Sequence, residues 1–198
     1  MTIACFVVPP GGTVPYPCAM PVQPPTPPVR IRAATSADLP VILAFIRELA
    51  AYEQLQHQVV ATEALLQQHL FGERPVAEAL IAETEGQAQG FALFFPHFST
   101  FLGRPGIYLE DLYVRETARG RGIGKALLSR LARIAVERAW GRVEWAVLDW
   151  NTPAIGFYKG VGATILDDWR ICRLTGDALV QLAGQESSGT HGSVRPQD

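Results

Sequence analysis

The sequence predicts an α/β domain in which helices flank a mixed, mostly antiparallel central sheet. Apolar residues recur with the period of a helix in several segments, and β-branched and aromatic runs of strand length lie between them. These segments are joined both by a tight turn and by whole helices, which give antiparallel and parallel strand neighbours respectively. The 198 residues, 48% of them hydrophobic, are enough for one core.

The domain is expected to begin with a strand and a helix. Residues 29–34 alternate between apolar and polar side chains, as in a strand. Thr35 follows as a candidate N-cap, and Asp38 stands three positions later, which is the spacing of a capping box. Leucine, isoleucine and phenylalanine at helical spacing then predict a helix that ends at about Tyr52.

A second helix and a hairpin are expected next. The helix follows Thr62 and stops at Gly72. Residues 78–95 divide into two short strands around Glu85 and Gly86, a pair that favours a tight turn.

The second half of the domain is predicted as strand, helix, strand, helix and strand. Residues 106–114 form a strand that leads into a glycine-rich loop, and the run "KALLSRLARIAVERAW" after it has one apolar face. Residues 142–150 are rich in β-branched and aromatic side chains and predict another strand. A short helix follows, with Pro153 in its first turn and Gly162 as its stop. Residues 163–174 are expected to close the sheet.

Both ends of the chain are excluded from this domain. Residues 1–29 hold nine of the 15 prolines, which remove amide donors and disfavour helices and central strands. Residues 184–198 are polar and rich in Gly and Ser. We therefore expect a disordered amino-terminal tail over 1–29, an N-terminal ligand for a partner being the alternative. The domain then covers 30–183, and a flexible tail covers 184–198.

Composition limits the partners and the compartment. Seventeen Lys and Arg against 19 Asp and Glu leave a net charge of -2, without the basic excess typical of proteins that bind nucleic acid or anionic membranes. No run approaches the ~20 apolar residues that span a bilayer, and no Lys or Arg precedes Arg30 as in a secretory signal. Three cysteines and four histidines show no metal-binding spacing, and Cys172 is expected in the core. These observations predict a cytoplasmic protein without a metal.

The segment "RGRGIG", residues 119–124, resembles a loop that approaches phosphates. A dinucleotide-binding loop needs G-x-G-x-x-G, whereas the three glycines here alternate. A Walker loop needs a glycine at the position of Arg119 and a hydroxyl residue at that of Ala126. The remaining pattern, Arg-x-x-Gly-x-Gly between a strand and a helix, favours a metal-free pyrophosphate held by backbone amides. A plain turn with permissive glycines is the alternative.

Four segments together, "YLEDLYV", "RGRGIG", "WNTPAIGFYKGVGA" and "DDWR", resemble the GNAT superfamily of N-acetyltransferases over about residues 29–183. They are most similar to the diamine (spermidine/spermine) and thialysine acetyltransferase group, and "VLDWN" is nearer to its thialysine members. The resemblance implies a GNAT-like fold, acetyl-CoA as co-substrate, a small-molecule amine as acceptor, and a homodimer.

The resemblance also implies the residues of the site. Tyr158 is the acid for the leaving thiolate, and Glu110 is the base for the amine. The coenzyme is implied to contact Leu112, Tyr113, Val114, Arg119, Gly120, Arg121, Gly122, Ile123, Gly124, Lys125, Asn151 and Ala154. The amine is implied to contact Tyr52, Glu53, Asp111 and Trp169.

Each of these residues also has a structural interpretation. Tyr158 follows Phe157 on an amphipathic helix and can be a core aromatic. Glu110 and Asp111 are adjacent on a strand, so they point to opposite faces unless a bulge intervenes. The alternatives for the others are a helix N-cap for Asn151, a solvated helix end for Tyr52 and Glu53, and a core aromatic for Trp169.

The predicted activity is a direct transfer from acetyl-CoA to the primary amine of a diamine, polyamine or thialysine-like molecule. Such an amine, with a pKa of ~10.4, arrives charged, so a carboxylate can bind it and then accept its proton. A peptide or protein N-acetyltransferase and a non-catalytic acyl-CoA-binding module are the alternatives. Binding alone needs neither Tyr158 nor Glu110, which argues against the module.

Overall fold

A computed structural model describes residues 27–184 of the chain. The chain divides into two compact units, Met1–Ala146 and Val147–Asp198, and each is described by itself. The predicted proline-rich tail and carboxyl-terminal tail lie almost wholly outside the described residues, together with Cys5, Cys18 and His191.

The first unit is built on a five-stranded sheet whose strands follow one another in sequence order. The first four strands are antiparallel neighbours, and the fifth is parallel to the fourth. The predicted mixed, mostly antiparallel sheet is therefore confirmed. The strands are β1 (Arg30–Ala33), β2 (Glu78–Thr84), β3 (Gln87–Ser99), β4 (Arg104–Val114) and β5 (Val143–Glu144).

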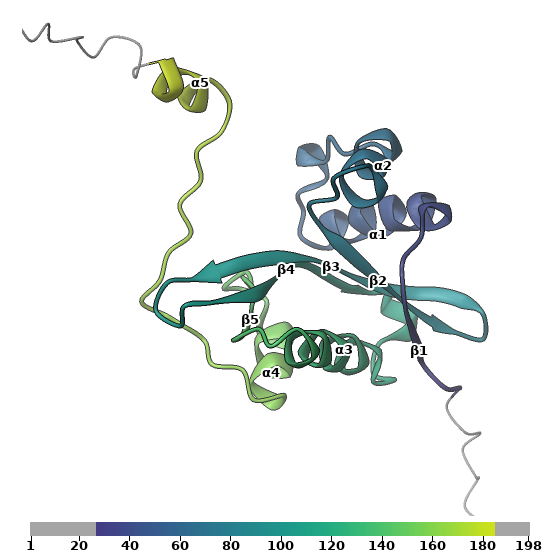
Figure 1. The fold of residues 1–198 in the computed structure, drawn as a ribbon. Helices are drawn as coiled ribbons and strands as arrows, with labels where there is room; N and C mark the ends of the chain where they lie inside the picture. Colours follow the sequence, from purple (N-terminus) through teal and green to yellow (C-terminus); the bar gives the residue numbers. More distant parts are fainter. Residues whose placement is uncertain (1–26, 185–198) are drawn as a thin grey trace, which may run out of the picture. The chain divides into compact units, whose positions relative to one another are not determined.

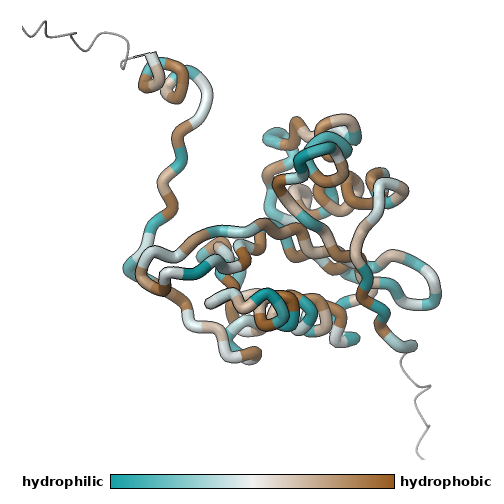
Figure 2. Tube along the Cα trace, in the orientation of Figure 1, coloured by the Kyte–Doolittle hydropathy of each residue, from teal (hydrophilic) through white to brown (hydrophobic). Residues whose placement is uncertain are grey.

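Helices cover both faces of this sheet. α1 (Leu39–Tyr52) and α2 (Glu63–Phe71) lie on one face, and α3 (Ile123–Glu137) lies on the other (Figure 1). On the α1 side the ring of Phe45 stacks on that of Phe91 of β3, with centroids 5.5 Å apart. Along α3, hydrophobic and hydrophilic residues alternate as on a helix with one buried face (Figure 2). All three helices were predicted from the sequence.

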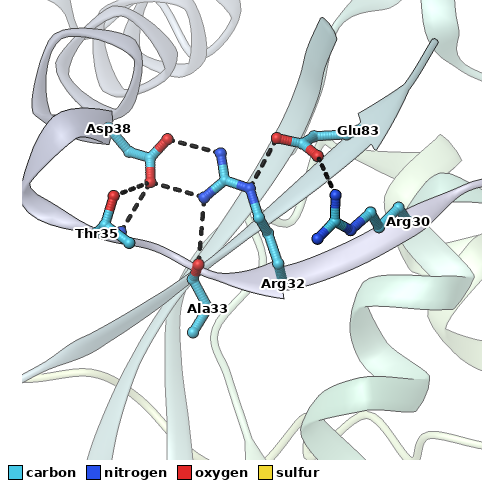
Figure 3. Close-up of polar contacts among 6 residues, drawn as sticks. All are labelled: Arg30, Arg32, Ala33, Thr35, Asp38 and Glu83. Atoms are coloured by element: carbon cyan, nitrogen blue, oxygen red, sulfur yellow. Dashed lines mark hydrogen bonds and ion pairs between the residues drawn. The ribbon is translucent and has the colours of Figure 1, made fainter. Parts of the chain in front are cut away.

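The start of α1 is fixed by a network around Arg32 (Figure 3). The guanidinium of Arg32 donates to both carboxylate oxygens of Asp38 at 2.7 Å and to Glu83 of β2 at 2.7 Å. Asp38 also accepts from the backbone N–H and the hydroxyl of Thr35, which confirms the predicted capping box at the short 3₁₀ helix Ser36–Asp38. The hydrogen bonds from Arg32 lower the pKa of Asp38 to about 2, although burial opposes this shift.

The predicted hairpin turn is also confirmed. Glu85 and Gly86 both have positive φ, 53° and 74°, as a two-residue turn between twisted strands requires. β2 pairs with β3 from Glu78↔Phe94 to Thr84↔Gln87.

The second unit contains α4 (Thr152–Gly160) and α5 (Gly176–Gly184). α4 begins with Pro153 in its first turn, as predicted, and Gly162 leaves it with a φ of 92°. α5 was not predicted from the sequence.

Two strand predictions near the end of the chain are wrong. Of residues 142–150 only Val143–Glu144 form a strand, and residues 163–174 form none in the described chain. The composition of 163–174 suits a strand, but a strand exists only where a neighbouring edge pairs with it. Cys172 is exposed, so its predicted place in the core is also wrong.

None of the helices between residues 27 and 184 combines the length and apolar character needed to cross a membrane.

Candidate active site

β4 carries an extra residue at Glu110. Phe94 of β3 pairs with Leu109, whereas Leu93, the next residue, pairs with Asp111. Glu110 therefore has no partner in the ladder, which is the geometry of a β-bulge. Because of this bulge, the adjacent carboxylates of Glu110 and Asp111 need not point to opposite faces of the sheet.

The bulge also reverses the edge of β4 towards which alternate N–H groups point. The N–H of Ile107 donates to the carbonyl of Arg142 on the β5 side, at 2.9 Å. The N–H of Arg115 donates to the carbonyl of Gln89 of β3, also at 2.9 Å. In a regular strand, N–H groups an even number of positions apart face the same edge. The extra residue between these two donors reverses that relationship.

Beyond the bulge, the N–H groups of Leu112 and Val114 therefore point away from β3, and that of Tyr113 points towards it. The β4–β5 ladder ends at Tyr108↔Glu144. Within residues 27–184 no strand pairs with this edge of β4 farther along. Two N–H donors on an open edge can bind the carbonyl groups of an extended ligand. Of the three predicted backbone donors, the N–H groups of Leu112 and Val114 thus face the open edge, and the N–H group of Tyr113 faces β3.

The glycine loop joins β4 to α3 through the 3₁₀ helix Glu116–Ala118. Gly120 and Gly122 have φ of 76° and 80°, in the left-handed region that favours glycine. A Cβ at either position would meet no heavy atom within 4 Å, so the space before this backbone is open. The N–H groups of residues 123–125 form the first turn of α3 and have no acceptor within the helix. These donors and the helix dipole suit a pyrophosphate.

Arg119 occupies the start of this loop. Its Nε donates to the carbonyl of Val114 at 3.1 Å, and its guanidinium lies 4.9 Å from the centroid of the Tyr52 ring. Tyr52 was expected to contact the amine, and the structure also places its ring beneath Arg119 of the loop. The exposed side chains of Arg121 and Lys125 add positive charge to the same loop.

Near the bulge, the carboxylates of Glu53, Glu110 and Asp111 interact electrostatically. α1 ends before Gln54, which has a φ of 61°, and this leaves Glu53 at the helix end. Burial, followed by the negative charges of Glu110 and Glu53, raises the pKa of Asp111 to about 7. Burial also raises the pKa of Glu53. Such a cluster can hold a cation and exchange a proton near neutral pH. Among the described residues neither this cluster nor any other has the arrangement of a metal site.

Arg115 and Glu48, which no sequence motif marked, form an ion pair next to the strand and helix that carry the candidate site. Arg115 donates to both carboxylate oxygens of Glu48 at 3.0 to 3.4 Å and to the carbonyl of Ala88 at 3.1 Å. Its guanidinium lies 4.8 Å from the centroid of Phe45. Burial, followed by the charge of Glu48, raises the pKa of Tyr113. Because Glu48 and Arg115 are 67 positions apart, no local pattern could have paired them.

The second unit holds the other predicted site residues. Asn151 accepts a hydrogen bond from the N–H of Ala154 at 3.3 Å, so it is the N-cap of α4. Tyr158 lies in α4, with its ring 5.3 Å from that of Phe157 and tilted by 51°. Trp169 is 74% exposed and is not a core residue.

A protein-family model described as the acetyltransferase (GNAT) family matches residues 43–163. This match includes β4, the glycine loop, α3 and α4.

Several named proteins are similar over most of this chain. An L-ornithine N5-acetyltransferase of Arabidopsis thaliana is 36% identical over 195 residues, which cover 76% of this chain and 86% of that protein. A thialysine N-epsilon-acetyltransferase of Bos taurus is 40% identical over 168 residues, 79% of this chain and 98% of that protein. A human spermidine/spermine N(1)-acetyltransferase-like protein 1 is 34% identical over 167 residues, 79% of this chain but 24% of its own length.

Solved structures share the fold. An integron cassette protein from the mobile metagenome of V. cholerae has a TM-score of 0.66 and 28% sequence identity, over 78% of this chain and 97% of that one. An aminoglycoside acetyltransferase from a soil metagenomic sample, solved with sisomicin, has a TM-score of 0.64, covering 75% of this chain and 97% of its own. At 19% identity the second likeness concerns the fold alone.

Proposed function

The chain belongs to the acetyltransferase (GNAT) family, and from this premise we propose that it transfers the acetyl group of acetyl-CoA to the primary amine of a small molecule. The proposal rests chiefly on the bulge at Glu110. The bulge brings two features together on one strand: carboxylates for an amine, and N–H donors on an open edge that leads to the glycine loop.

The residues of the loop and the open edge fit the donor. Gly120 and Gly122 leave open space before the loop backbone, and the first N–H groups of α3 supply donors for a pyrophosphate. Leu112 and Val114 would then hold the extended arm of the coenzyme through their N–H groups. When bound, acetyl-CoA supplies the acetyl group as a reactive thioester.

The carboxylates and Tyr158 supply the proton transfers. Glu110 takes a proton from the bound ammonium, directly or through water, and leaves a neutral amine that can attack. Formation of the new C–N bond breaks the C–S bond, and the phenol of Tyr158, with an ordinary pKa of ~10, gives its proton to the departing sulfur. The acylated nitrogen then loses its extra proton, which restores the phenol of Tyr158 directly or through water. Tyr158 has this role because its segment "GFYKGVGA" matches the motif of the family. Asn151 and Ala154 are proposed to contact the coenzyme on the same ground.

The acceptor is proposed to be a small molecule with a side-chain or terminal amine and a second polar group. Two of the similar proteins are named for acetylation of ornithine at N5 and of thialysine at Nε. Asp111 and Glu53 are proposed to hold the cationic part of such a molecule, because burial and mutual repulsion make their negative charge costly without a cation nearby. Trp169 is proposed to contact the amine, because its segment "DDWR" resembles the family.

We further propose a homodimer in the cytoplasm. The segment 163–174 has the composition of a strand but no partner in the described chain, and Leu166, Trp169 and Ile171 are exposed on it. A second copy would supply the missing strand edge. The exposed thiol of Cys172 suits a reducing compartment. Light scattering of the purified protein gives the oligomeric state, and a monomeric mass at micromolar concentration would contradict the dimer.

An amine panel tests the activity. Purified protein is incubated with acetyl-CoA and with thialysine, ornithine, lysine, short diamines, spermidine or a peptide, and free thiol release and product mass are recorded. We expect thiol release with amino acids or diamines that carry a side-chain amine, and much less with Glu110→Gln. Absence of thiol release with every amine would refute the proposal, and a preference for the peptide would indicate a peptide acetyltransferase.

A further inference from the structure

One face of α1 holds the backbone that follows β4. Phe45, Glu48 and Tyr52 stand at positions i, i+3 and i+7 of the helix and therefore share a face. Arg115 engages the first two of these residues, and Arg119 engages the third. α1 thus contacts the start of the glycine loop at two points that are one turn apart.

The contact at Arg119 fixes a side chain that would otherwise be free to rotate. Nε of Arg119 donates to the carbonyl of Val114, and Cζ of the guanidinium lies over the Tyr52 ring, 4.9 Å from its centroid. In the described part of the chain, the two terminal nitrogens of Arg119 make no hydrogen bond. A guanidinium held by its Nε and by a ring beneath its Cζ keeps its terminal N–H groups available in a restricted range of directions.

We infer that Tyr52 is a positioning residue for the acyl donor: its ring holds Arg119 in the orientation in which the guanidinium meets the pyrophosphate. This inference rests on the proposed function, in which the glycine loop binds acetyl-CoA. It gives Tyr52 a role beyond the contact with the amine that the resemblance implies.

The next residue serves the other substrate. The negative charge of Glu53 contributes to the raised pKa of Asp111, while the ring of Tyr52 lies beneath Arg119. Two consecutive residues at the end of α1 therefore act on different substrates. This separation gives a matched pair of variants, Tyr52→Leu and Glu53→Gln.

The test compares two acetyl donors. Acetyl-CoA has the pyrophosphate, and S-acetylpantetheine lacks it. We expect Tyr52→Leu to weaken CoA binding, measured by calorimetry, by roughly two- to fivefold, the usual range for one exposed cation–π contact. The same variant should leave kcat/KM with S-acetylpantetheine unchanged. Tyr52→Phe keeps the ring face and should restore most of the CoA affinity. Glu53→Gln should alter the KM for the amine and leave the Kd for CoA as in the wild type.

A double-mutant cycle completes the test. Arg119→Gln should weaken CoA binding, and adding Tyr52→Leu to it should cause no further loss, because we infer that the ring affects CoA binding through Arg119. The inference is overturned if Tyr52→Leu binds CoA as the wild type does, if it loses S-acetylpantetheine activity equally, or if Tyr52→Phe is as weak as Tyr52→Leu. If the wild type itself binds no CoA, the proposed function fails and this inference fails with it.

Discussion

Asp111 lies beside Glu110 at the bulge of β4, where burial and then the negative charge of Glu110 raise the pKa of Asp111 to about 7. The charge of Glu53 contributes in the same direction. The chain therefore keeps a carboxyl group that is half protonated near neutral pH at the site proposed for a cationic substrate.

This shift predicts how stability depends on pH. An acid whose pKa is higher in the folded state binds more protons when folded, so its contribution is most favourable below its unfolded pKa of 3.8 and is lost as the pH rises through about 7. Asp111→Asn mimics the protonated form. We expect the unfolding free energy of Asp111→Asn, measured relative to that of the wild type, to rise by at least about 1 kcal/mol from pH 5 to pH 8, since one pKa unit corresponds to roughly 1.4 kcal/mol.

The measurement is urea unfolding of both proteins at several pH values. Glu63→Gln is the control, since Glu63 lies at the start of α2 and is exposed. A difference between Asp111→Asn and the wild type that stays constant from pH 5 to pH 8 would contradict the raised pKa.

Tyr158→Phe tests the proposed acid. Removal of the phenolic proton should lower kcat by about 10² or more, as for other lost general acids, while the Kd for CoA changes little. Stopped-flow thiol release and calorimetry give the two quantities. Phe157→Leu, which changes the neighbouring ring, is the comparison variant and should retain far more of the turnover. Equal losses of turnover and CoA affinity in Tyr158→Phe would mean that the side chain is structural.

Asp38, which has no proposed part in the reaction, is expected to contribute to the stability of the fold. Asp38→Ala removes two hydrogen bonds to Arg32 and the acceptor for Thr35, so we expect a loss of about 1–3 kcal/mol in unfolding free energy at pH 7. Asp38→Asn keeps a capping oxygen and should lose less. Because the folded pKa of Asp38 is lowered to about 2, its stabilisation is present above the unfolded pKa of 3.8 and disappears as the pH falls through 2. A full effect of Asp38→Ala that persisted at pH 2 would contradict this account.

Local chemistry explains which elements the sequence could predict. The capping box of Thr35 and Asp38 and the turn at Glu85 and Gly86 depend on neighbours within a few positions, and both are present in the structure. The family match was also predictable, because its motifs are short and ordered along the chain. In each case the information lies in short segments and does not depend on how distant segments pair.

Register and long-range pairing explain what the sequence could not predict. The bulge at Glu110 exists only relative to Leu93 and Phe94 of β3, and nothing in the sequence around Glu110 records that register. The failed strand at 163–174 has the right composition but no partner edge in the described chain. Tyr52 likewise has a helical context in the sequence, and only the fold brings Arg119 over its ring.

The glycine loop yields a prediction that separates backbone strain from ligand contact. Gly122 precedes α3 with a φ of 80°, and a Cβ there meets no protein atom, so Gly122→Ala should cost about 1–2 kcal/mol from the left-handed conformation alone. Gly103, in the turn between β3 and β4, has a φ of 60° and equally open surroundings, and it is the matched control. Both alanine variants should lose similar unfolding free energy by urea titration. Only Gly122→Ala should weaken CoA binding, because its methyl group would occupy the space through which a pyrophosphate approaches the backbone. Equal CoA affinity in the two variants would show that the open space before Gly122 is not where the donor binds.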